Sequence, residues 1–174
     1  MAHNFAIPHD LAHFVVEDAL RLRRGFWGSV ANGAVFPSMT YVDGRRKPKA
    51  AQQSRDLLKA NADDLNEAEV LVRIFNDTIE QGHQESSAVL RSRLNDRLWR
   101  RGEAPREINA AEISAVYAAY NAVRQSWRQV PVGGALDLIW GATSPRVNRD
   151  GYKGRMPTVQ APGSRGSHAG RLQR

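Results

Sequence analysis

The chain has 174 residues, a formal net charge of +7 at pH 7 and no cysteine. This length suits one domain of ordinary size, which can bury a core without cross-links. The absence of cysteine excludes disulfides, thiolate metal sites and thiol nucleophiles, so any metal ion would need histidine and carboxylate ligands. The first ten residues, MAHNFAIPHD, lack the basic and apolar regions of a signal peptide, and no apolar run of about 18 residues occurs. We therefore expect a cytoplasmic protein without a membrane segment.

The positive charge is concentrated at the C-terminus. Residues 141–174 carry seven Arg and Lys residues and one acid, Asp150, which leaves 18 bases and 17 acids on residues 1–140. The same segment is rich in Gly, Pro, Ser and Arg, so it cannot bury enough apolar surface to offset the entropy of ordering. We predict a helical domain at 1–140 and a basic, mostly disordered tail at 141–174.

The first predicted element is a helix that begins near Pro8 or Asp10, since proline and an acidic residue both suit a first turn. It is expected to run to about Arg24, with Gly25 as its stop. The stretch that follows, GFWGSVANGAVFPSM, is interrupted by glycines and a proline. Its periodicity does not decide between a short helix and a packed loop.

The rest of the body also shows helical spacing. Apolar residues from about 50 to 81 recur at three- and four-residue steps, as in one long helix or two helices broken near Asn61–Asp64. SSAVLRSRLNDRLWRRG repeats the pattern, and a further helix is expected to follow Asn109, which we predict to form a capping pair with Glu112 three residues later. ALDLIWG is a short apolar piece that we expect to dock on the core. About five helices without strand alternation predict an all-α bundle.

Two of the five histidines lie four residues apart in the first predicted helix. Positions four apart differ by only about 40° around a helix, so His9, His13 and Glu17 form a ladder on one side. Two imidazoles and a carboxylate at this spacing can share one metal ion, and these donors suit Zn, Fe or Mn better than Ca. We expect Asp10 to orient a ligand or accept a proton. The alternative is that His9 caps the first turn and His13 is a core histidine bonded to a buried acceptor.

A second group of possible ligands lies in the segment DTIEQGHQE. Glu80 and His83 are three residues apart, a spacing found in carboxylate–histidine sites of helical bundles. If their helix packs antiparallel to the first, they become further ligands of the same ion. Because Gly82 interrupts the stretch, the alternative is a hydrophilic helix end.

The run PHDLAHFVVE followed by GFWGSVANGAVF resembles, over residues 7–36, a bacterial and chiefly actinobacterial family without an established activity. That family has a Pro-His-Asp-x-x-His-x-x-x-Glu segment before a Gly-Phe-Trp-Gly segment. The His-Asp-x-x-His letters are also similar to a zinc-binding family of ubiquinone biosynthesis, whose glutamate comes much later than Glu17. His9-Asp10 is similar to the doublet of the all-helical His-Asp phosphohydrolases, whose upstream histidine lies farther away than His3.

The aromatic pair Phe26-Trp27 lies between Gly25 and Gly28. Glycine beside bulky rings allows close approach of backbone segments. The pair therefore forms either one wall of a ligand pocket or a tight corner between helices.

Two functions follow from these features. In the first, a small helical protein holds a transition metal and acts on a small molecule. In the second, the body is a scaffold or interaction module whose basic tail contacts an acidic partner or nucleic acid. The tail has a single aromatic residue, Tyr152, and the body has no helix-turn-helix signature, phosphate-binding glycine loop or Gly-x-Ser-x-Gly elbow. We therefore favour the metal hypothesis.

Overall fold

The computed structural model describes residues 7–37, 39–41, 48–82, 87–101, 107–131, 135–141, 159–160 and 171–173. Within these stretches the chain forms six helices: α1 (His9–Ala19), α2 (Phe26–Ala31), α3 (Ala50–Ala60), α4 (Ala62–Glu80), α5 (Ser87–Arg101) and α6 (Ala110–Arg128). Four short strands are β1 (Thr40–Tyr41), β2 (Ala135–Asp137), β3 (Val159–Gln160) and β4 (Arg171–Gln173). They form two antiparallel pairs, β1 with β3 and β2 with β4. The predicted all-α class is confirmed.

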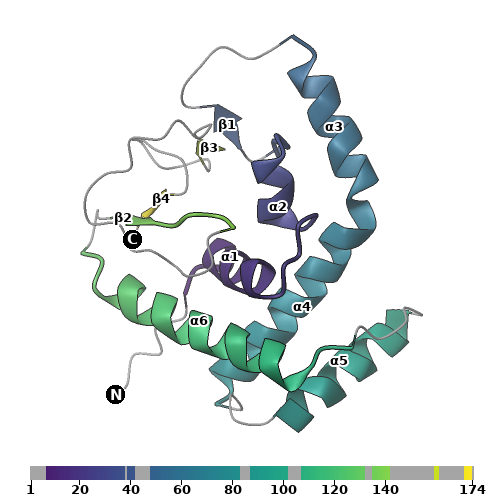
Figure 1. Cartoon of the computed structure of the whole chain (residues 1–174). Coiled ribbons are helices and arrows are strands. Elements are labelled where there is room, and N and C mark those ends of the chain that lie inside the picture. The colour runs from purple at the N-terminus through teal and green to yellow at the C-terminus, as the bar shows by residue number, and fades with distance from the viewer. Residues whose placement is uncertain are drawn as a thin grey trace.

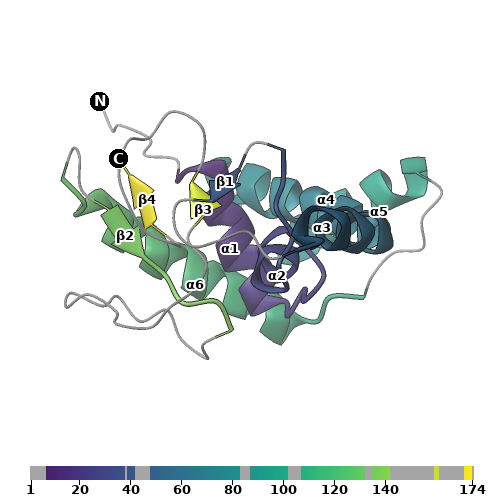
Figure 2. The same cartoon turned by 90° about the horizontal axis from the view of Figure 1, so that it is seen from above.

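The central element is α1, which packs against both α6 and α4 and also contacts α2 (Figures 1 and 2). Its residues from Leu11 to Glu17 are all buried. A helix covered on all sides in this way belongs to the core rather than to the surface. The largest fully buried apolar or aromatic side chains of the described core are Tyr120, Phe75, Leu11, Leu71, Leu90 and Ile113.

The first helix ends earlier than the sequence predicts, at Ala19 rather than near Arg24. Arg21 adopts a left-handed conformation with φ 55°, and the N–H of Leu22 donates to the carbonyl of Glu17 at 2.8 Å. This conformation costs a residue with a side chain roughly 1–2 kcal/mol. The early turn reverses the chain and brings α2 back onto α1.

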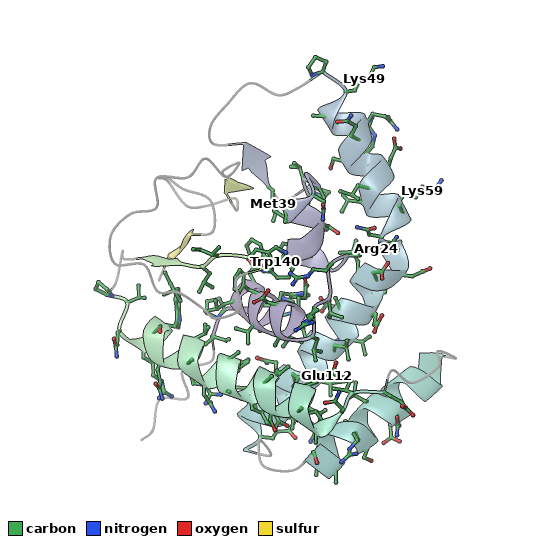
Figure 3. The ribbon with its side chains drawn as sticks, viewed as in Figure 1. Arg24, Met39, Lys49, Lys59, Glu112 and Trp140 are labelled. Carbon is green, nitrogen blue, oxygen red and sulfur yellow. The ribbon has the colours of Figure 1, made fainter. Side chains whose placement is uncertain are left out.

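The segment from 50 to 81 forms two helices, the second of the two forms that its spacing allows, and the break is at Asn61. Figure 1 shows α3 and α4 running nearly in line. Arg24 donates to the carbonyl of Ala60 at 2.7 Å and to Oδ1 of Asn61 at 2.9 Å, and Figure 3 shows it beside this junction. The Asn61 amide in turn donates to Oγ of Ser29 at 3.0 Å. The buried Asn61 therefore ties α2 to the start of α4.

The piece ALDLIWG docks on the core as expected. Leu136 is buried in the main cluster, Leu138 packs against it, and the ring of Trp140 lies 5.6 Å from that of Phe14 in α1. Figure 3 shows Trp140 next to α1. The predicted disorder of 141–174 falls on a segment that lies mostly outside the described residues. Within it, the structure describes Gly141 and the strands β3 and β4. None of the helices described is both long and apolar enough to cross a membrane.

The predicted capping pair is present at the start of α6. The N–H of Glu112 donates to Oδ1 of Asn109 at 2.9 Å, and the N–H of Asn109 donates to Oε2 of Glu112 at 3.0 Å. Two N–H groups that lack partners within the helix are thereby satisfied.

Replacing Asn109 with Ala should lower the free energy of unfolding by about 1 kcal/mol, because the side-chain acceptor of the cap is lost. Urea denaturation followed by circular dichroism measures the change. Asn109→Asp keeps an acceptor and is the matched control. Equal stabilities of the Ala and Asp variants would contradict a contribution from the cap.

Candidate metal centre

The carboxylate of Glu17 is fully buried and holds the N-terminus of α2. Its Oε1 accepts the N–H of Phe26 at 3.0 Å, and its Oε2 accepts the N–H of Trp27 at 3.0 Å. These N–H groups have no acceptor within α2, and the start of a helix favours negative charge. A Cβ on Gly25 would lie 2.6 Å from Cδ of Glu17, so glycine leaves the room that the carboxylate occupies. Glu17 thus takes the place of a capping side chain for α2.

The same carboxylate orients His13. Nδ1 of His13 lies 2.8 Å from Oε1 of Glu17, and Nε2 lies 3.0 Å from Oε2 of Glu69 in α4. The histidine side chain is 6% exposed, whereas that of Glu69 is 53% exposed. The ring therefore lies between a buried carboxylate and one at the surface, with Nε2 turned toward α4.

His9 lies one turn before His13 and joins the outer end of this arrangement. Its Nε2 is 3.7 Å from Oε1 of Glu69, and the two histidine rings are 4.6 Å apart between centroids. One possible ligand atom each from His9, His13 and Glu69 lies within 4.8 Å of the others. Two atoms bound about 2.1 Å from one ion are roughly 3.0–3.4 Å apart. The group therefore fits a metal ion after a small inward movement, which the exposed side chains of His9 and Glu69 allow.

The charge on His13 is set by opposing effects. Burial lowers the pKa of His13, but the hydrogen bond to Glu17 and the negative charges of Glu17 and Glu69 raise it, and the net pKa lies above the ordinary 6.5. In its protonated form the ring bridges the two carboxylates. A metal ion at Nε2 would take the place of one proton, so metal affinity would fall as pH is lowered.

The structure brings together two of the three residues that the sequence predicts as ligands, His9 and His13, and adds Glu69. Glu17 contacts His13 from the opposite ring nitrogen, and both of its oxygens accept backbone N–H groups. Asp10 is exposed, and its contact with α2 is made by its backbone carbonyl, which accepts the indole N–H of Trp27 at 2.8 Å.

Glu80, the described member of the second predicted group, does not lie at the histidine pair. Glu80 ends α4, roughly 16 Å beyond Glu69 along the helix axis at about 1.5 Å per residue. Together burial and the charge of Glu80 raise the pKa of Tyr120 to about 12. His83 lies outside the described residues. The sequence offers no signal for Glu69, because only the packing of α4 on α1 distinguishes it from the other glutamates.

Phe26 and Trp27 belong to a group of half-buried rings. Phe26 stacks on Phe36 with centroids 4.6 Å apart and lies 5.6 Å from the ring of His13. Trp27 meets Phe14 at 5.9 Å. These contacts hold α2 against α1, as in a corner between helices, and a pocket wall stays a prediction.

The stability of the metal-free protein should depend on pH through His13. Because the pKa of His13 is raised in the folded state, its contribution is fully present below the unfolded value of 6.5 and is lost as pH rises through the folded pKa. We expect the melting temperature in EDTA to fall above pH 6.5, and the advantage over His13→Gln to shrink over the same range. Scanning calorimetry at several pH values measures both. A difference between the two proteins that stays constant with pH would contradict this assignment.

No protein-family model, curated protein or solved structure matches the chain.

Proposed function

We propose that this protein binds one divalent transition metal ion through Nε2 of His9, Nε2 of His13 and the carboxylate of Glu69. The observation that carries the proposal is the convergence of these three groups, from two helices, within 4.8 Å. Imidazole nitrogens combined with a carboxylate favour Zn, Fe or Mn over Ca.

The alternative, a histidine that only satisfies the core, accounts for less of this arrangement. The buried Glu17 already provides His13 with a hydrogen-bond partner at Nδ1. Nothing in the core requires a second histidine and a further carboxylate at Nε2, where both His9 and Glu69 are more than half exposed. His9, Glu69 and Nε2 of His13 are thus arranged as a set of ligands near the surface, and Glu17 supports His13 from the buried side.

Three protein ligands leave at least one coordination position for water or a small molecule, as in catalytic rather than structural metal sites. The exposure of His9 and Glu69 leaves this side open to solutes. A bound ion supplies Lewis-acid chemistry at the open position. His9, His13 and Glu69 would hold the ion, and the hydrogen bond to Glu17 fixes the orientation of the His13 ring. A small molecule with an oxygen donor is the class of ligand that this site suits.

The wild-type protein, purified without a histidine tag, should retain about one equivalent of Zn, Fe or Mn in elemental analysis. His13→Ala should abolish metal retention, and Glu69→Gln should weaken binding measured by calorimetry at least about tenfold, because a charged ligand is lost. Added metal should raise the melting temperature of the wild type, since binding to the native state alone is stabilising.

Asp63→Asn is the matched control, because it removes one negative charge from an exposed position of the same helix. Equal effects of Asp63→Asn and Glu69→Gln would indicate a response to net charge only. No metal in the wild type, together with a His13→Leu variant as stable as the wild type, would favour the core-histidine interpretation instead.

A further inference from the structure

We propose that Glu17 is the positioning residue of this metal site and that it links metal binding to the docking of α2. The inference rests on the proposed function, since it concerns the same ion. Glu17 itself contacts His13 and the backbone of α2, and the three ligand atoms come from other residues.

The two carboxylates beside His13 decide which ring nitrogen carries the proton. His13 has a carboxylate at each nitrogen, but Glu17 is fully buried and Glu69 is half exposed. Solvent and salt weaken the outer interaction much more than the inner one. The neutral ring therefore keeps its proton on Nδ1, where it donates to Glu17, and presents the free electron pair of Nε2 to the metal.

His13 and α2 share the carboxylate of Glu17. Oε1 of Glu17 accepts from Nδ1 of His13 at 2.8 Å and from the N–H of Phe26 at 3.0 Å, while Oε2 accepts from Trp27. Because one rigid carboxylate group makes all three bonds, a narrow range of positions satisfies them together, and a shift away from it weakens at least one of them. An ion on Nε2 holds the ring in the orientation that serves all three bonds. Metal binding and the docking of the first turn of α2 therefore stabilise each other, and the coupling is reciprocal.

Gly25 provides a way to disturb Glu17 without touching the ligands. A Cβ at this position would lie 2.6 Å from both Cδ and Oε2 of Glu17. Since such a separation is not tolerated, Gly25→Ala must displace the carboxylate from His13 or from α2. A loss of metal affinity in this variant would therefore be caused by the displacement of Glu17.

The test uses the full chain and titration with Zn²⁺. Glu17→Gln and Gly25→Ala should each weaken Zn²⁺ binding about 10- to 100-fold, the usual effect of losing the partner of a metal-bound histidine. Ala31→Ser, at an exposed position at the end of α2, should leave the affinity unchanged. In the wild type, Zn²⁺ should slow hydrogen exchange at the amides of Phe26 and Trp27, a readout that a merely structural role of Glu17 would not move.

A second measurement needs neither a variant nor a metal. Nitrogen-15 spectra of the neutral His13 ring in the metal-free wild type should show the proton on Nδ1. A proton on Nε2 would overturn the positioning role. Unchanged Zn²⁺ affinity in folded Glu17→Gln and Gly25→Ala would overturn the link to α2 and leave the proposed function standing. A wild type that binds no Zn²⁺, Fe²⁺ or Mn²⁺ would overturn the proposed function and, with it, the positioning role of Glu17 in metal binding.

Discussion

The buried carboxylate of Glu17 is the interaction on which the rest of the structure depends. A carboxylate removed from water is costly unless donors surround it. Here it has three, from His13 and from the first two N–H groups of α2. To supply them, the chain must leave the helical path soon after Glu17 and return at once, which explains the turn through Arg21. The position of Gly25 is fixed by the same requirement, because a side chain there would occupy the space of the carboxylate.

The candidate metal centre is a consequence of this arrangement at its outer end. Because Glu17 is bonded to Nδ1 of His13, Nε2 points toward α4. The residue that α4 places opposite Nε2 therefore decides which group the histidine contacts. Asn61 and Arg24 fix the start of α4 against the turn between α1 and α2. A rotation of α4 by one residue position, about 100°, would carry Glu69 away from both histidines. Polar contacts about two helical turns before Glu69 thus decide which residue of α4 joins the candidate metal centre.

Much of the fold follows from local signals, and the site follows from them only in part. Helical spacing and the Asn109–Glu112 pair predict α6, and the ladder of His9 and His13 is visible in the sequence. The end of α1 is not predicted, because the left-handed residue is Arg21 rather than a glycine. Glu69 is not predicted either, since its role arises from the packing of two helices far apart in the sequence.

Glu17 shows why a correct helical face is not enough to assign a role. The spacing places it on the same side as the histidines, and a carboxylate there is a reasonable ligand. Two unpaired N–H groups at the start of α2 compete for the same oxygens, and in a buried site these bonds are hardly screened. Glu69, in contact with water, has no such demand on it and can move toward an ion at little cost. The same residue type is therefore held by buried bonds at the inner end of His13 and by solvent-exposed contacts with His13 and His9 at the outer end. This difference in solvent exposure favours Glu17 as the support and Glu69 as the ligand.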